Sequence, residues 1–157
     1  MIFKKILPVI LLALFAVGCS VKTVKNTKKK IPKSAGIVSL TSLTSDIIFT
    51  LSPEELIGIP GSSILRKNEN LKNITTVSEG RMPPNIEKII SLNPKLVIGS
   101  QGFHDKTLDK LNELGIDVLN TKVNSLSDLF GLVDELSRIT NSDSEIVFKK
   151  LKECLID

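Results

Sequence analysis

Four short polar segments of this chain carry the side chains best suited to bind a small molecule. They are residues 41–45, 60–63, 78–82 and 100–104, and each follows a short apolar run. Together they offer hydroxyl, carboxylate, amide, guanidinium and imidazole groups, which form directional hydrogen bonds and ion pairs. The candidate ligand-binding residues in these segments are Ser42, Gly61, Ser62, Glu79, Arg81, Gln101, Phe103 and His104.

Arg81 and His104 are the most chemically specific of these candidates. Arg81 is able to hold a carboxylate or phosphate in a bidentate contact, but a surface ion pair with Glu79 is the alternative. His104 is the only histidine, and it either contacts a ligand or metal or is simply a polar residue at a helix start. One histidine is a poor basis for a zinc-type site, which needs three or four ligands. We therefore expect no bound metal and no cofactor. Phe103 either stacks on a ligand or packs in the core.

Enzymatic patterns are missing from the sequence. It contains no phosphate-binding loop with a conserved Gly-Lys pair, no G-x-G-x-x-G and no H-E-x-x-H. A serine hydrolase would need His104 as its base, and no G-x-S-x-G elbow accompanies that histidine. We therefore expect a protein that is not an enzyme. Because the chain has no Trp or Tyr, a ligand site would be mostly polar.

The N-terminus has the features of a bacterial export signal. Lys4 and Lys5 precede an uncharged apolar run, residues 6–17, which is shorter than the roughly 20 residues needed to span a bilayer. Small residues then precede Cys19, in a pattern that resembles a bacterial lipobox. We expect residues 1–18 to be a lipoprotein signal peptide and Cys19 to be the lipidation site. An ordinary cleaved signal with an incidental cysteine is the alternative. Anchoring at Cys19 would place the protein in the cell envelope, attached to a membrane and facing the periplasm or exterior.

Charge is distributed very unevenly along the chain. Eight of the 21 basic residues and none of the 17 acidic residues precede Asp46, so 13 basic residues face all 17 acidic ones from there on. Residues 19–35 are rich in lysine and are expected to form a tether, either solvated or lying against anionic lipid headgroups. The remainder is mildly acidic, so we expect no nucleic-acid partner. Cys154 lies in an apolar helical pattern and is expected to be a small buried residue rather than a reactive thiol.

The polar segments are positioned by alternating short strands and helices. Apolar, β-branched runs predict strands, and capping residues followed by apolar residues at i, i+3 and i+4 predict helices. This alternation predicts an α/β fold, a single Rossmann-like lobe with a mostly parallel sheet flanked by helices. Ligands of such sheets bind beyond the carboxyl ends of the strands, where the four polar segments belong. The strands are expected at residues 37–40, 56–59, 74–77, 96–99 and 116–119, and the helices at 46–51, 86–92, 105–114, 126–139 and 145–156.

Five blocks of sequence follow one another in a recognisable order. They are residues 37–49 (IVSLTSLTSDIIF), 54–59 (EELIGI), 84–99 (PNIEKIISLNPKLVIG), 108–118 (LDKLNELGIDV) and 126–129 (LSDL). In this order they resemble the N-terminal lobe of periplasmic binding proteins for iron–siderophore complexes and cobalamin, which serve ABC transporters. The resemblance covers about residues 36–157, and its most specific part is Asn85 to Gly99.

The resemblance implies a bilobed architecture with ligand held between two α/β lobes that a long helix joins. The helix from Glu145 onward matches the start of that joining helix. The implied function is the solute-binding component of an ABC uptake system for a metal chelate such as an iron–siderophore complex, cobalamin or haem. The implied partners are the permease subunits, and Glu87 matches the acidic residue that docks onto permease arginines. An exposed glutamate favoured by the helix dipole is the simpler interpretation of Glu87.

The second lobe of the family has no counterpart within these 157 residues. We expect a truncated form that binds a chelate weakly on its own, because one lobe provides half of a cleft. A half-size protein that pairs with another chain is the other interpretation of this length. A different function, a lipoprotein interaction module that reuses the same lobe without transport, is the alternative from another class.

The lipobox pattern leads to a first prediction. Cells fed a labelled fatty acid should incorporate label into the wild-type protein and not into the Cys19→Ala variant, because the thiol is the acceptor of the lipid. Cys154→Ala serves as the control and should be labelled like the wild type. Equal labelling of the wild type and Cys19→Ala would show that residues 14–20 are not a lipobox.

Overall fold

A five-stranded, all-parallel β-sheet forms the centre of the fold. The structure, a computed structural model, describes residues 36–79 and 82–156, with side chains as far as Glu153. The strand order is β3-β2-β1-β4-β5. The strands are β1 (Ile37–Ser39), β2 (Leu56–Gly61), β3 (Thr75–Glu79), β4 (Leu96–Ser100) and β5 (Val118–Thr121).

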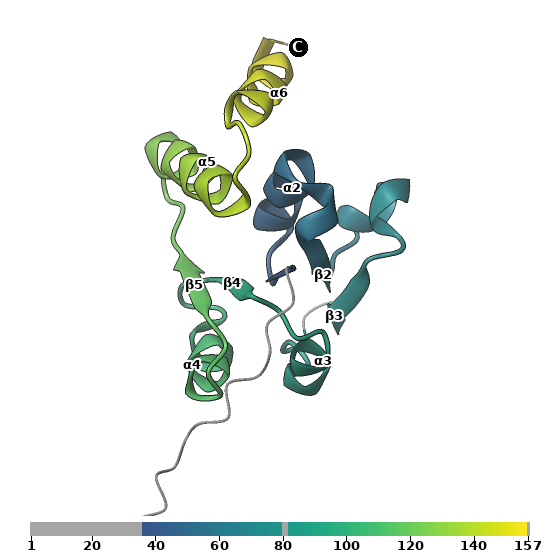
Figure 1. Ribbon diagram of the computed structural model, residues 1–157. Coiled ribbons are helices and arrows are strands. Elements are labelled where there is room, and N and C mark those ends of the chain that lie inside the picture. Colours follow the sequence, from purple (N-terminus) through teal and green to yellow (C-terminus); the bar gives the residue numbers. More distant parts are fainter. Residues whose placement is uncertain (1–35, 80–81, 157) are drawn as a thin grey trace, which may run out of the picture.

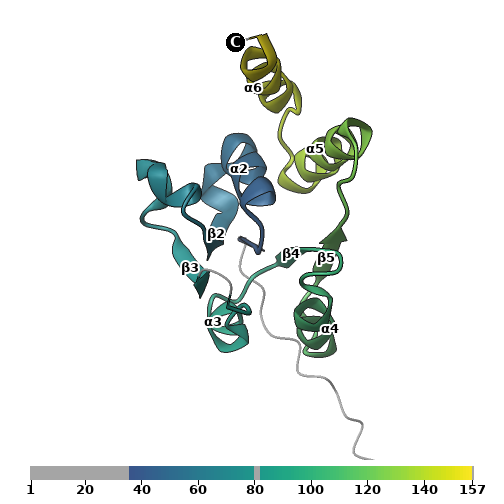
Figure 2. The same ribbon diagram turned by 180° about the vertical axis from the view of Figure 1, so that it is seen from behind.

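Helices cover both faces of this sheet, as Figures 1 and 2 show from opposite sides. On one face α2 (Ser42–Leu51) packs beside α5 (Leu126–Thr140), and α6 (Glu145–Ile156) packs against α2. The other face is covered by α3 (Ile86–Ser91) and α4 (Asp105–Glu113). Three short 3₁₀ helices precede or follow β2: η1 (Pro53–Glu55), η2 (Leu65–Lys67) and η3 (Glu69–Leu71).

The core consists of two apolar clusters, one on each face of the sheet. Successive side chains of a strand point to opposite faces, so Ile37 joins the cluster beneath α2 and α5, and Val38 joins the cluster above α3 and α4. Neighbouring β4 contributes Ile98 and Val97 to the two clusters in the same way. All four side chains are fully buried. Burial on both faces explains why these strands read as continuous apolar runs rather than alternating ones.

The predicted fold class is confirmed, and all five predicted strands are present. Several of the expected boundaries are wrong. The segment 41–45 is not a loop: α2 begins at Ser42, because the Thr41 side chain accepts a hydrogen bond from the Thr44 N–H at 3.1 Å and caps the helix. Strand β2 does not stop before Pro60 but continues to Gly61, and a shift in the register with β3 between Ile59 and Pro60 accommodates the proline.

The expected position of β5 is also wrong by two residues. Gly115 has a φ of +83°, and the N–H of Ile116 donates to the Leu111 carbonyl at 3.1 Å, which completes a Schellman turn after α4. The backbone of Ile116 therefore ends the helix, and its side chain is buried in the cluster that includes α4. The strand begins at Val118. Gly115 ends the helix as predicted, because glycine tolerates positive φ.

Several sequence predictions fall on residues outside the described ranges. Cys19, the signal peptide, the tether and Arg81 belong to this group, and so does the side chain of Cys154. Within the described ranges no helix is long and apolar enough to cross a membrane. The same residues contain no group of three or more His, Cys, Asp or Glu side chains arranged to hold a metal ion.

Candidate functional site

The strand order places a topological switch point between β1 and β4. From β1 the chain proceeds outward to β2 and β3, then returns past β1 to form β4 and β5. The segments that leave the carboxyl ends of β1 and β4 therefore diverge, and a crevice opens between them. In open parallel sheets this crevice is where ligands bind.

A cavity of about 800 Å³ lies at this carboxyl edge of the sheet. Its volume falls within the range of small-molecule sites in proteins. Residues at or after the carboxyl ends of β1, β2, β3 and β4 all contribute to its walls, so it is built by this edge of the sheet as a whole. The cavity is lined by Leu40, Thr41, Pro60, Ser78, Met82, Pro83, Pro84, Ser100, Phe103, His104, Lys106 and Thr107.

The loop between β4 and α4 forms one wall of the cavity and is held by its own hydrogen bonds. The Phe103 N–H donates to the Ser100 carbonyl at 3.2 Å, and Gly102 has the positive φ that the third position of such a turn favours. The Asp105 carboxylate accepts from the Gly102 N–H at 2.9 Å and from the Asn120 amide at 2.7 Å. These contacts fix Phe103 and His104 at the cavity wall.

His104 is fixed more tightly than its neighbours. Its Nδ1 accepts a hydrogen bond from the Ser100 N–H at 3.1 Å, and its backbone N–H donates to the Ser100 carbonyl at 2.9 Å. Burial lowers the pKa of His104 below its usual value, against the opposing effects of the Ser100 backbone hydrogen bond and the Asp105 carboxylate. Gly99 makes this close packing possible, since a Cβ there would lie 2.8 Å from the His104 Cβ.

Hydroxyl groups beyond β1 form the opposite side of the crevice. Ser39 is fully buried and its hydroxyl donates to the Thr41 carbonyl at 2.9 Å. The Thr41 hydroxyl is 2.7 Å from that of Thr44, which is also buried. The Ser45 hydroxyl donates to the Thr41 carbonyl at 2.7 Å. This network satisfies the buried polar groups and holds Thr41 at the cavity.

Among the described residues, one side chain supplies charge to the cavity wall. Lys106 is the one Lys, Arg, Asp or Glu among the lining residues that the structure describes. The apolar part of the wall is exposed: Phe103 is 87% exposed and Met82 is 69% exposed. The interpretation of Phe103 as a core residue is therefore wrong, and its ring is available to a partner or ligand. The wall combines apolar surface with hydrogen-bond donors and one cation.

The structure brings two of the predicted ligand-binding residues, Phe103 and His104, to this cavity. Ser42 lies in the first turn of α2 and borders a different depression, beside Asp46 and Lys150. Ser62 accepts a hydrogen bond from the Ile64 N–H beyond the end of β2. Neither serine lines the cavity.

The remaining described candidates, Gly61, Glu79 and Gln101, make contacts within the fold and do not line the cavity. Gly61 packs against β3, where a Cβ would lie 2.3 Å from the Ser78 carbonyl oxygen. Glu79 forms an exposed ion pair with Arg66 at 2.8 Å, and Arg81, the partner considered from the sequence, lies outside the described residues. The backbone N–H of Gln101 donates to the Thr121 carbonyl at 2.9 Å, and Gln101 is exposed and not among the lining residues.

Several lining residues were not singled out from the sequence, although Thr41 and Ser100 lie in the predicted polar segments 41–45 and 100–104. Thr41 and Ser100 each bring a hydroxyl group to the cavity, and Lys106 brings an ammonium group. The available signal was positional: Thr41 and Ser100 stand at the ends of the two strands that flank the switch point. That signal requires the strand order, which the sequence alone does not provide.

Glu87 lies away from the cavity, on the first turn of α3. Asn85 caps this helix by accepting from the Lys88 N–H at 3.0 Å, and Glu87 is exposed beside it. No salt bridge joins Glu87 to another residue of the described ranges. A carboxylate in the first turn is favoured by the helix dipole, and here it also faces solvent, where a partner can reach it.

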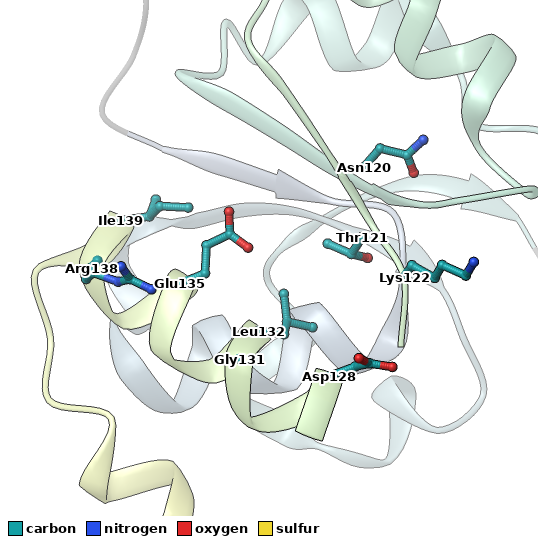
Figure 3. A pocket seen from close by; sticks show the side chains of 9 residues that line it. All are labelled: Asn120, Thr121, Lys122, Asp128, Gly131, Leu132, Glu135, Arg138 and Ile139. Carbon is teal, nitrogen blue, oxygen red and sulfur yellow. The ribbon is translucent and has the colours of Figure 1, made fainter. Parts of the chain in front are cut away.

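A second hollow, of about 580 Å³, lies between β5 and α5 (Figure 3). Its charged side chains are two acidic and two basic ones, Asp128, Glu135, Lys122 and Arg138. Asp128 accepts from the Asn124 and Ser125 N–H groups in the capping box of α5, which lowers its pKa. Because this hollow is away from the switch point and its cap carboxylate is occupied, the cavity between β1 and β4 is the better candidate site.

Comparison with solved structures identifies proteins of similar fold. An ABC transporter substrate-binding protein from Listeria monocytogenes superposes with a TM-score of 0.64 and 20% identity, over 78% of this chain and 46% of that chain. The periplasmic vitamin B12-binding protein of Vibrio cholerae superposes with a TM-score of 0.61 and 20% identity, over 76% of this chain and 49% of that chain. A periplasmic haem-binding protein from Roseiflexus superposes with a TM-score of 0.57 and 29% identity, over 67% of this chain and 40% of that chain. This chain has the fold of part of a substrate-binding protein.

This chain spans less than half of the length of each of these three neighbours. All three are described as binding proteins. No family model matches the sequence, and no curated protein matches it either.

The close approach of Gly99 to His104 leads to a prediction. Gly99→Ala places a methyl group against the His104 Cβ and 2.9 Å from a Leu108 methyl carbon, so it should destabilise the fold by about 1–3 kcal/mol and displace the imidazole. Gly131→Ala is the matched control, because its Cβ would meet nothing within 4 Å on a helix. It should leave stability unchanged or raise it by up to about 1 kcal/mol.

Denaturant unfolding and the NMR signal of the single histidine measure the two effects. A Gly99→Ala variant as stable as Gly131→Ala, with an unchanged imidazole signal, would contradict the tight packing described here.

Proposed function

We propose that this chain is the solute-binding component of an ABC uptake system for a metal chelate, and that residues 36–157 are its N-terminal lobe. The observation that carries the proposal is the cavity at the switch point of a sheet with the substrate-binding-protein fold. Leu40, Thr41, Pro60, Ser78 and Ser100 are held at or next to the strand ends, and Phe103 and His104 by the hydrogen bonds of the β4–α4 loop. A site on rigid elements of this kind selects ligands by shape and by a few polar contacts.

The composition of the wall supports a chelate as the ligand. Exposed Met82 and Phe103, together with Pro83 and Pro84, offer an apolar surface that a large organic ligand can cover. In this proposal the metal arrives within its own chelator, so the wall contacts the organic part of the ligand. Neighbours of similar fold include proteins described as binding vitamin B12 and haem. The identity of the chelate is left open among iron–siderophore complexes, cobalamin and haem.

The envelope location belongs to the same proposal. Lipid attachment at Cys19 and a tether over residues 19–35 would keep the lobe close to a membrane. A binding protein works beside its permease, so tethering raises the effective concentration of the two partners. The neighbours described as periplasmic support a location in the envelope.

Titration of residues 20–157 tests the function. We predict that haem, cobalamin or a ferric siderophore shifts the NMR signals of the cavity amides, with a dissociation constant near millimolar. A complete cleft with micromolar affinity corresponds to about −8 kcal/mol, and halving the contacts leaves about −4 kcal/mol. Ligand pockets bury about 70–90% of a small molecule, and a single wall buries less.

Two results would contradict these statements separately. Chelates that leave every cavity amide unchanged at their solubility limit would refute the proposed function. A monomer that binds with a micromolar or tighter constant would refute the half-cleft argument and would show that this chain is a complete receptor.

Glu87 provides a test of the permease partner. A photo-crosslinking amino acid at position 87, introduced in cells of the source organism, should crosslink to the membrane subunit of an ABC transporter. The same replacement at Glu135, an exposed glutamate on α5 in the opposite helix layer, is the control and should not. Crosslinking of a permease from Glu135 alone, or from neither position, would count against docking through α3.

A further inference from the structure

The hydrogen bond of Ser100 determines which nitrogen of His104 carries the proton. A backbone N–H is a donor and has no acceptor function, so the Nδ1 atom that receives it at 3.1 Å must present a lone pair. In a neutral imidazole the proton then resides on Nε2. Burial lowers the pKa of His104, which favours the neutral form of the ring.

This tautomer is the opposite of the one a metal ligand requires. A histidine that binds metal through Nε2 carries its proton on Nδ1 and donates that proton to a carbonyl or carboxylate. Here Nδ1 faces the Ser100 N–H, so the second proton would meet another donor. Binding a metal through Nδ1 would require breaking the same hydrogen bond. Nε2 has no hydrogen-bond partner among the described residues, and His104 lines the cavity.

The groups around His104 favour an acceptor with negative charge. Lys106 follows it by two residues and lines the same cavity, and no carboxylate is among the described lining residues. The nearest acidic side chain in sequence, Asp105, accepts from Gly102 and Asn120 and is not among the lining residues. An oxygen anion in the cavity would therefore find an imidazole N–H and an ammonium group without a competing carboxylate.

We infer that His104 recognises the ligand as a hydrogen-bond donor through Nε2–H, to a carboxylate or similar anionic oxygen at the periphery of the chelate, and is not a ligand of the chelated metal. This inference rests on the proposed function, since it names what the cavity recognises. Among chelates it favours those with peripheral carboxylates. His104 is thereby a specificity-determining residue of this site.

The tautomer is measurable before any ligand is added. Because the chain has one histidine, ¹⁵N-histidine labelling of the full chain in detergent gives a single imidazole spectrum. Long-range ¹H–¹⁵N correlation should show an unprotonated Nδ1 and a protonated Nε2 at pH 7. The reverse assignment, with the proton on Nδ1, would overturn the inference whatever the ligand is.

Two porphyrins then separate the anionic oxygen from the metal. Metal-free coproporphyrin and its iron(III) complex carry the same carboxylates, so they should bind the full chain with affinities within about twofold of each other. Both should shift the Nε2 proton and leave Nδ1 unprotonated. His104→Asn keeps an acceptor close to the position of Nδ1 and loses the donor at Nε2, and it should weaken both porphyrins roughly tenfold. His104→Gln restores a donor near Nε2 and should recover most of the affinity.

The outcomes are distinct. If both porphyrins bind and His104→Asn is without effect, or if iron increases the affinity only when His104 is present, the inference is wrong and the proposed function stands. If neither porphyrin shifts the amides of Ser78, Ser100 and Thr107 up to its solubility limit, the proposed site for such chelates and the role of His104 are both refuted.

Discussion

The parallel pairing of β1 with both β2 and β4 is the constraint on which the rest of the structure depends. β1 is only three residues long, yet Ile37, Val38 and Ser39 are all fully buried, and each apolar one supplies a different face of the core. A polar residue in such a position costs free energy unless its hydroxyl is bonded, and Ser39 is bonded to the Thr41 carbonyl. The same bond holds the backbone at the point where the chain leaves the sheet. Packing and site geometry are therefore determined together at the end of one strand.

The central position of β1 also explains why the cavity has walls from so many segments. Its two neighbours in the sheet are strands that the chain reaches by moving in opposite directions. The polypeptide leaves β1 toward α2 on one face and leaves β4 toward α4 on the other, and the cavity lies between the two strand ends. Pro60, Ser78 and the residues after β3 close the third side. The resulting surface is fixed by backbone hydrogen bonds, with Phe103 and Met82 as its exposed apolar side chains.

The sequence predicted the elements better than their ends. Apolar runs such as 96–99 are long enough to predict buried strands, and the helix-ending role of Gly115 followed from its position. The start of α2 was missed because Thr41, Ser42, Thr44 and Ser45 are all good capping residues, and only tertiary packing selects Thr41. The extension of β2 through Pro60 was missed because proline normally ends a strand, whereas here the register shifts beside it.

The site was predictable only in part, for a topological reason. Every strand is followed by a polar segment, so from the sequence alone the segments after β1, β2, β3 and β4 are equally good candidates for the ligand site. Strand order distinguishes them, and it depends on contacts between distant residues that no local pattern encodes. His104 and Phe103 were found because a lone histidine and an aromatic residue stand out in a polar loop. Arg66, which pairs with Glu79, was not foreseen because it lies 13 positions earlier in the chain.

The position of β4 beside β1 has a consequence for how the protein acquires its site during folding. The two strands are separated in sequence by α2, β2, β3 and α3, and bringing them together closes the longest loop in the sheet around the crevice. Closing a loop of this length costs conformational entropy. That cost is offset only when both apolar clusters are complete. The crevice therefore does not exist in any partly folded form that lacks the β1–β4 pair. Any molecule that occupies it adds its binding free energy to the cooperative stability of the entire sheet, so occupancy and global protection from unfolding should rise together.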